Sequence, residues 1–302
     1  MNSAFLVSFL SAGVRVATPL LLAALGESIA ESSGVINLGV EGAMLSGALA
    51  AALGASAGGP WAGAVAATVA GAALALLFAL IAVGAGANQV ITGTALTLGA
   101  VGLTGSAYRS FYGAAGVGLS LPTFPVLPVP GLHRIPVIGP VLFEQTVLTY
   151  AAFALIPILS HLLFRTRWGL AVRAAGESVR GARAAGVPVR RVRALALVIG
   201  GALAGLAGAS LVLAQVGTFA EKMTAGRGFI AIAIVVLGGW RPWRVAAAAL
   251  FFGTAMALQF VFQSVLLGVP YQLFLMLPYV LTLLVLAGAV GRVTAPAELG
   301  RD

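Results

Sequence analysis

Cysteine is absent from this sequence, and histidine and charged residues are scarce. Without cysteine there is no disulfide framework, no thiolate metal site and no cysteine nucleophile, and His133 and His161 are too few for a histidine-rich metal centre. Charged residues make up 8% of the 302 residues, against about 25% in a typical soluble domain. Because 60% of the residues are hydrophobic, these values exclude a water-soluble chain and indicate a membrane protein.

The positive charge is concentrated in one segment. Residues 165–193 hold eight arginines and one glutamate, which is +7 of the formal net charge of +9. A nucleic-acid-binding domain would spread its bases over a soluble face, so nucleic acid is not expected as a partner. Positively charged loops stay in the cytoplasm, and residues 165–193 are therefore predicted to form a cytoplasmic loop.

Uncharged stretches predict the membrane spans, because a helix needs about 20 apolar residues to cross the hydrocarbon core. Breaks at Gly58-Gly59-Pro60 and at 84–88 divide the uncharged stretch 42–108 into three. Residues 228–240 are apolar but only 13 long, which fits a short or half-membrane helix. The full-length spans are predicted as follows: one in 1–26, three in 42–108, one each in 145–164 and 194–220, and two in 245–291, broken at 268–270.

These spans predict an all-α, polytopic bundle of about eight to ten membrane helices that forms a single domain over residues 1–302. Residues 1–26 lack a charged n-region and a cleavage site, so they are expected to be a retained span. Counting the predicted spans back from the cytoplasmic loop places the N-terminus on the outer side of the membrane. Residues 110–143, with six of the 14 prolines, are then an ordered outside loop.

Carboxylates and amides near the spans are the candidate site residues. Glu27 and Glu31 share one face of a helix, and they either line a pathway or cap an interfacial turn. Asn88 and Gln89 precede a run of threonines, and such neutral groups suit a polyhydroxylated or amide-bearing solute, although hydrogen bonding between helices explains them equally well. Glu41 lies at the start of an apolar helix, so its carboxylate needs a partner or a water-filled face.

Two roles are open for Glu41. It either stays ionised in a water-filled pathway or forms a structural pair with Arg15, the base within the first span, and the pair is the favoured hypothesis. The sequence contains no Walker P-loop and no H-E-x-x-H motif, and its serines and histidines have no credible triad partners. An enzyme is therefore not expected, and neither is a cofactor or a metal.

The cytoplasmic loop carries a second pattern. Residues 173–187 predict a short helix that is closed by Gly186 as its C′ residue, with Glu177 and Arg180 spaced i, i+3. Its small faces would fit a groove on another protein, whereas its arginines could instead bind anionic lipid headgroups.

Three stretches carry a resemblance to a known family: residues 26–42, residues 173–187 together with 201–208, and residues 228–233 leading to 237–239 and Pro242. The chain resembles the permease subunits of bacterial ABC importers, in the branched-chain amino acid, ribose and nucleoside branch, and is most similar to nucleoside or simple-sugar permeases. The resemblance extends from about residue 10 to 290.

The resemblance implies half of a translocation pathway in the bacterial inner membrane. Its partners would be a second, similar permease, two cytoplasmic ABC ATPase subunits, an extracytoplasmic solute-binding lipoprotein and the lipid bilayer. Pairing with an identical or a different permease is left open. The residues that match the ATPase-coupling helix are Gly176, Glu177, Ala184, Ala185, Gly186 and Val187, and the suggested pathway residues are Asn37, Glu41, Asn88 and Gln89.

Two alternatives accompany this interpretation. A branched-chain amino acid permease of the same family would have the same architecture, because the receptor rather than this chain is expected to set specificity. A stand-alone secondary transporter or channel would use Glu41 as an ion or proton site.

Overall fold

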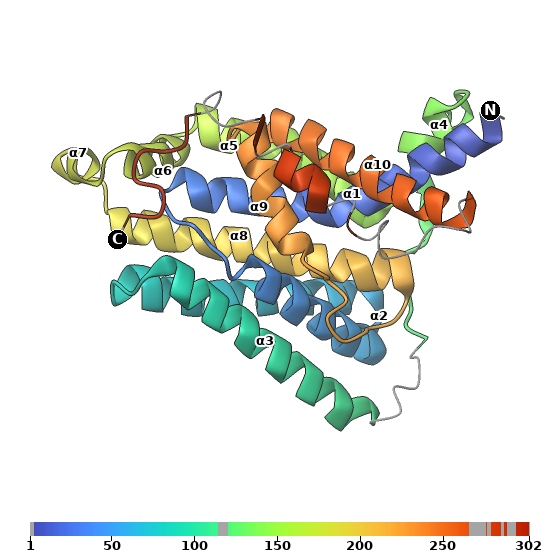
Figure 1. Ribbon diagram of the computed structural model, residues 1–302, viewed down its shortest axis with the longest axis horizontal. Helices are drawn as coiled ribbons and strands as arrows, with labels where there is room; N and C mark the ends of the chain where they lie inside the picture. Colours follow the sequence, from blue (N-terminus) through green and yellow to red (C-terminus); the bar gives the residue numbers. More distant parts are fainter. Residues whose placement is uncertain are drawn as a thin grey trace.

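The computed structural model describes residues 3–113, 120–265, 276, 279–284, 287–288 and 294–301. In this part of the chain the long helices lie side by side in one bundle (Figure 1). They are α1 (Ser3–Ser32), α2 (Val40–Phe78), α3 (Gln89–Tyr112), α5 (Val147–Arg165), α8 (Val189–Leu211) and α10 (Pro242–Val265). The shorter helices are α4 (Ile138–Leu142), α6 (Arg167–Glu177), α7 (Val179–Ala184) and α9 (Arg227–Gly238). The predicted all-α fold is confirmed.

Single turns and one small hairpin complete the described elements. They are the π-helical turns η1 (Ala79–Gly84) and η3 (Val212–Val216), the 3₁₀ turn η2 (Leu132–Arg134), and the antiparallel strands β1 (Val126–Pro128) and β2 (Glu144–Thr146). The hairpin, η2 and α4 all lie in or next to the predicted Pro-rich loop, which therefore has local structure where it is described.

In the described residues, five helical stretches are long and apolar enough to cross a membrane: Phe5–Ser32, Val40–Gly84, Gln89–Tyr112, Val147–Arg165 and Val189–Val216. The stretch Val40–Gly84 is a helical hairpin, because Gly58 (φ −146°) and Gly59 (φ +80°) leave the helical conformation just before Pro60. A Cβ added to Gly54 would lie 2.9 Å from the Cα of Gly63, so the two arms run antiparallel in contact. The predicted break at Gly58-Gly59-Pro60 is confirmed.

Two further boundaries agree with the sequence pattern. The second arm of the hairpin ends with η1 at Gly84, and α3 begins at Gln89, as the predicted break at 84–88 requires. The short apolar helix expected at 228–240 is α9, which has 12 residues. α10 covers the first half of the stretch 245–291, and most of the second half, with the break at 268–270, lies outside the described residues.

The core is formed where α8 lies between α1 and α2 (Figure 1). Glycines bring these helices into backbone contact: a Cβ on Gly47 of α2 would lie 2.5 Å from the Cα of Gly205 of α8. On the other side of α8, a Cβ on Gly26 of α1 would lie 3.1 Å from the Cα of Gly200. Small residues allow this close approach in lipid, where apolar surface alone gives helices no reason to associate.

The two ends of the bundle carry different segments. α6, α7 and residues 294–301 lie at one end, next to the chain that follows α1, and the start of α1 lies with α4 at the other end (Figure 1). Ser11 Oγ donates a hydrogen bond to the carbonyl of Pro140 at 3.3 Å, which ties the start of α1 to α4. The loop predicted to be cytoplasmic therefore lies at one end of the bundle, while the assignment of that end to the cytoplasm stays a prediction.

Candidate functional site

The chain between α1 and α2 is not helical, and residues 33–39 form a connecting loop. Gly34 has φ +89°, a left-handed conformation that favours glycine and turns the chain out of α1. Non-helical backbone inside a membrane protein must be satisfied by other protein groups. Side chains of α1, α3 and α8 do so here: Glu27 Oε1 accepts from Asn37 N (3.1 Å), Gln89 Oε1 accepts from Ile36 N (2.9 Å), Thr97 Oγ1 donates to Leu38 O (3.0 Å) and Arg193 Nε donates to Ser33 O (3.0 Å).

Glu41 lies just after the connecting loop, in the first turn of α2, and is 7% exposed. Its Oε1 accepts hydrogen bonds from the hydroxyl of Thr224 (2.6 Å) and the backbone N–H of Gly226 (2.8 Å), and its Oε2 accepts from the N–H of Gly228 (2.7 Å). Gly226 is the N-cap residue of α9. The carboxylate thus accepts the N–H groups that the start of a helix leaves unpaired, at the positive end of the helix dipole.

The favoured pair between Glu41 and Arg15 is wrong. Arg15 is exposed, its Nε donates to the carbonyl of Ser11 one turn earlier at 3.4 Å, and its own carbonyl accepts from Gln215 at 2.8 Å. The backbone N–H groups at the N-terminus of α9 compensate the buried Glu41 carboxylate, a role that we expected a cation to have.

Glu27 and Glu31 lie on one face of α1, as expected, and both are 1% exposed. Glu27 accepts a hydrogen bond from the backbone N–H of Asn37 in the connecting loop. Glu31 Oε2 accepts a 2.6 Å hydrogen bond from the indole N–H of Trp240. Trp240 is 8% exposed, so its ring is buried against α1 and does not face a membrane interface. The neighbouring Trp243 is 61% exposed and can take such a position.

The suggested pathway residues separate into two groups. Asn37, which is 2% exposed, Glu41 and Gln89 are buried around the connecting loop, where each holds backbone groups. Asn88 is exposed, and its Oδ1 accepts from Ile91 N at 3.1 Å to cap α3. Contact of these residues with a transported solute stays a prediction.

The predicted helix 173–187 is two helices. The break lies at Ser178, where φ is −156° and the side chain caps α7 by accepting from Gly181 N at 3.1 Å. The predicted end at Gly186 is confirmed, because this residue has φ +79° and the N–H of Val187 returns to the carbonyl of Ala182. We refer to residues 167–187, which comprise α6, α7 and this turn, as the coupling segment.

Gly176 differs from the other predicted coupling residues. A Cβ on Gly176 would overlap the carbonyl of Ser32, so this residue packs inward against the end of α1. The others are exposed or half-buried at the end of the bundle and are accessible to a partner: Glu177, Ala184, Ala185, Gly186 and Val187.

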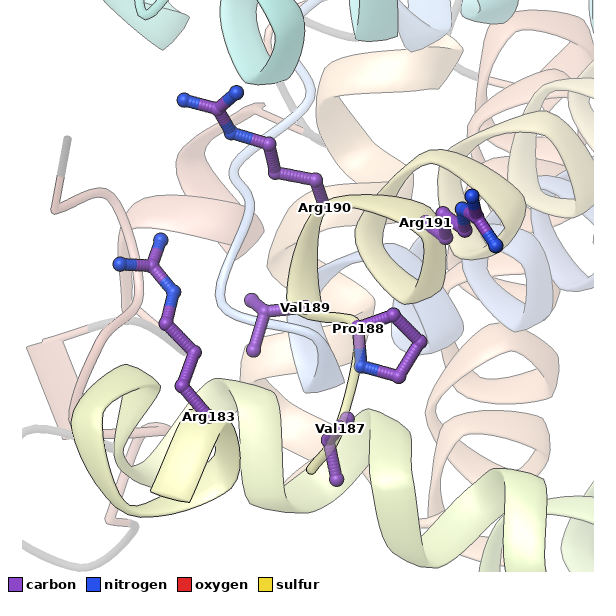
Figure 2. A pocket seen from close by; sticks show the side chains of 6 residues that line it. All are labelled: Arg183, Val187, Pro188, Val189, Arg190 and Arg191. Atoms are coloured by element: carbon purple, nitrogen blue, oxygen red, sulfur yellow. The ribbon is translucent and has the colours of Figure 1, made fainter. Parts of the chain in front are cut away.

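A basic notch of about 400 Å³ opens beside the coupling segment, lined by Arg183, Val187, Pro188, Val189, Arg190 and Arg191 (Figure 2). Its three arginines are exposed, and none of their guanidinium groups has a hydrogen bond or ion pair with another described residue. A guanidinium offers a planar fork of donors that suits carboxylates and phosphates. Such a surface can bind an acidic partner.

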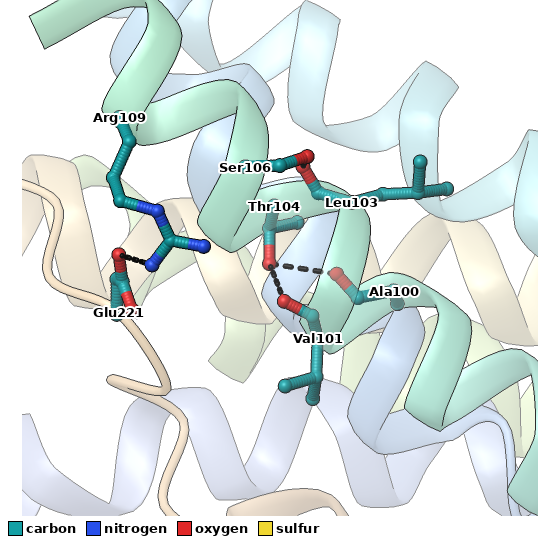
Figure 3. Close-up of polar contacts among 7 residues, drawn as sticks. All are labelled: Ala100, Val101, Leu103, Thr104, Ser106, Arg109 and Glu221. Atoms are coloured by element: carbon teal, nitrogen blue, oxygen red, sulfur yellow. Dashed lines mark hydrogen bonds and ion pairs between the residues drawn. The ribbon is translucent and has the colours of Figure 1, made fainter.

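The loop before α9 is also tied to α3. Arg109 Nη1 lies 2.8 Å from Glu221 Oε1, and Figure 3 shows the two side chains meeting between α3 and this loop. On the same helix Thr104 Oγ1 donates to the carbonyl of Ala100 at 2.7 Å (Figure 3). The Arg109 and Glu221 side chains are 55% and 39% exposed, so the pair contributes little to stability.

Several contacts of the candidate site were not predicted from the sequence, namely those made by Arg193, Thr224, Gly226, Gly228 and Trp240. One signal was available: Gly226 and Gly228 stand directly at the start of the short apolar stretch, where a helix N-terminus needs an acceptor. Among the described residues, no three histidines, aspartates or glutamates lie close enough together to hold a metal ion.

These features define the class of protein. Membrane-length helices indicate a multi-pass membrane protein, and a short helix whose N-terminus lies against buried non-helical backbone is a feature of transporter folds. The chain belongs to the family of branched-chain amino acid transport system permease components, which matches residues 9–286. Members of this family are membrane subunits of ABC transporters and not enzymes.

Three relatives share most of the chain's length. TsgC13 of Haloferax volcanii, whose name assigns it provisionally to glucose ABC transport, is 40% identical over 269 residues, with 87% of this chain and 80% of the relative covered. The guanosine ABC transporter permease NupQ of Bacillus subtilis is 36% identical over 294 residues, with 94% and 92% covered. The nucleoside ABC transporter permease NupC of Lactococcus lactis is 31% identical over 293 residues, with 94% and 92% covered. No solved structure matches the chain.

Proposed function

We propose that this permease forms half of the translocation pathway for a nucleoside or a simple sugar. The observation that carries the proposal is the likeness to the guanosine permease NupQ, 36% identical over 94% of this chain. The names of the three relatives assign them to the transport of guanosine, of nucleosides and, provisionally, of glucose. The polar side chains buried around the connecting loop include neutral amides and hydroxyls that suit such solutes.

The family also implies an ATPase and a solute-binding component as partners. In the proposed assembly, two ATPase subunits and a second permease join this chain in the bacterial inner membrane, and an extracytoplasmic receptor delivers the solute. The coupling segment would dock on the ATPase through Glu177 and residues 184–187, and Asn37, Glu41, Asn88 and Gln89 would mark the pathway. The accessibility of the coupling residues at one end of the bundle supports this arrangement.

The test is uptake by the complete transporter in proteoliposomes. Radiolabelled guanosine, uridine, ribose, glucose and leucine are supplied with the receptor, with and without internal ATP. ATP-dependent uptake of a nucleoside or sugar is expected. ATP-dependent uptake of leucine alone would contradict the substrate class and favour a branched-chain amino acid permease. Uptake by this chain alone, driven by an ion gradient, would contradict the ABC mechanism.

A further inference from the structure

The segment Thr294–Arg301 lies where the coupling segment meets the connecting loop, and we call it the tail segment. We propose that the tail segment is a positioning element that transmits movement of the coupling segment to the connecting loop. This inference rests on the proposed function, because it presupposes that an ATPase moves the coupling segment.

Glu298 spans the break between α6 and α7. Its backbone N–H donates a 2.8 Å hydrogen bond to the carbonyl of Gly176, at the end of α6. Its Oε1 accepts from the N–H of Val179, the first residue of α7, at 3.4 Å. One residue of the tail segment therefore holds both helices of the coupling segment at the point where they are joined by non-helical backbone.

The next residues of the tail segment bind the connecting loop and α3. The N–H of Gly300 donates to the carbonyl of Gly34 at 3.3 Å, and the carbonyl of Arg301 accepts from Gln89 Nε2 at 3.2 Å. The same Gln89 side chain accepts from Ile36 N, inside the loop. Four consecutive residues, 298–301, thus connect the coupling segment, the connecting loop and the start of α3.

No direct hydrogen bond duplicates this connection in the described part of the chain. Gly176 touches Ser32 and Gly34 by van der Waals contact, but no hydrogen bond runs from α6 or α7 to residues 33–39. A single van der Waals contact between two atoms resists separation only weakly. A hydrogen bond is stronger and directional, so the tail segment supplies the stronger link when the coupling segment moves away from the loop. The loop it holds leads directly to Glu41 and, through Glu41, to α9.

Gly300 offers a way to loosen the tail segment. Its φ is +72°, and an added Cβ would lie 2.8 Å from Ile36 Cδ1, so Gly300→Val strains the backbone and displaces either the tail segment or the Ile36 side chain of the loop. Gly113→Val is the matched control, because Gly113 has φ +78° but a Cβ added there would meet no atom within 4 Å. Glu298→Ala is a milder second variant that removes the acceptor for Val179 and keeps the backbone donor.

The measurement is solute uptake per ATP hydrolysed by the reconstituted transporter, together with recovery of the ATPase on the purified permease. Gly300→Val should lower the uptake per ATP about five-fold or more while the ATPase still co-purifies. Glu298→Ala should lower it less, and Gly113→Val should match the wild type. Each ratio is compared with that of the wild-type transporter.

Two results would overturn the proposal: equal ratios for Gly300→Val, Glu298→Ala and Gly113→Val, or loss of uptake only in proportion to lost ATPase recovery, which would make the tail segment an assembly element. The proposed function is judged separately, by the wild type. Absence of ATP-driven uptake in the wild-type transporter overturns that function, whereas a normal wild type with unchanged variants overturns the role of the tail segment alone.

Discussion

Replacing Glu41 tests whether its carboxylate holds the start of α9. In Glu41→Ala, three donors lose their acceptor: the Thr224 hydroxyl and the N–H groups of Gly226 and Gly228. A buried donor left unpaired costs about 1–3 kcal/mol, which gives an upper range of roughly 3–9 kcal/mol. Because the loop can shift and recover some bonds, we expect a loss of about 5 kcal/mol in the free energy of unfolding.

Two milder variants each remove only part of the interactions of Glu41, so each should lower the free energy of unfolding by less. Glu41→Gln keeps one oxygen acceptor but turns an amide NH₂ toward a donor and removes the charge at the helix N-terminus, so it should cost about 2–4 kcal/mol. Thr224→Val removes one donor and its hydrogen bond, which should cost about 1 kcal/mol. Arg15→Gln is the control, because Arg15 does not contact Glu41, and it should change stability by less than about 0.5 kcal/mol.

The assay is reversible unfolding of the purified permease in mixed detergent micelles. The losses should follow the order Glu41→Ala, Glu41→Gln, Thr224→Val and Arg15→Gln, from largest to smallest. A Glu41→Gln variant as stable as the wild type would refute the capping role. So would an Arg15→Gln variant that loses as much as Glu41→Gln, because that result would restore the ion pair.

Other changes have equally definite outcomes. Gly208→Ala should lower the free energy of unfolding by about 1–3 kcal/mol, because the new methyl group would overlap the backbone of α2. The control Gly99→Ala should not lower it, because a Cβ added there meets no atom within 4 Å. Equal losses for the two variants would contradict the close packing of α8 against α2. Glu177→Arg should abolish uptake while the permease stays in the membrane, and wild-type uptake with normal ATPase association would contradict the coupling assignment. Arg109→Gln should cost less than about 1 kcal/mol because the pair with Glu221 is exposed, and a larger loss in the same assay would mean that the pair is shielded.

The helices were predictable because charge is excluded from the hydrocarbon core. The uncharged stretch 42–108 and its breaks at Gly58-Gly59-Pro60 and 84–88 indicated the hairpin and α3, and the shortness of 228–240 indicated α9. These features depend on length, composition and local backbone conformation, which are all properties of neighbouring residues. The turn at Gly186 that follows α7 was predictable for the same local reason.

The contacts of the site were harder to predict, because they join distant positions through main-chain atoms. Glu41 accepts a hydrogen bond from the backbone N–H of Gly226, 185 positions further along the chain. Because every residue except proline has a backbone N–H, the sequence does not indicate which one will be the partner. The pair with Arg15 was favoured because a sequence identifies charged side chains directly, so a cation was the partner of Glu41 that could be recognised. The burial of Trp240 was unpredictable for a related reason, since it depends on Glu31 of another helix.

The backbone contacts of α8 with α1 and α2 also restrict how the transporter can move. At Gly26–Gly200 and Gly47–Gly205 no layer of side chains separates the helices, so they cannot slide or rotate past one another without a clash. The three helices should therefore behave as a rigid body throughout the transport cycle. Displacement has to occur where helices meet through side chains, as α5 meets α1 at the Thr18–Thr149 hydroxyl pair, because rotamer changes there can accommodate a small shear.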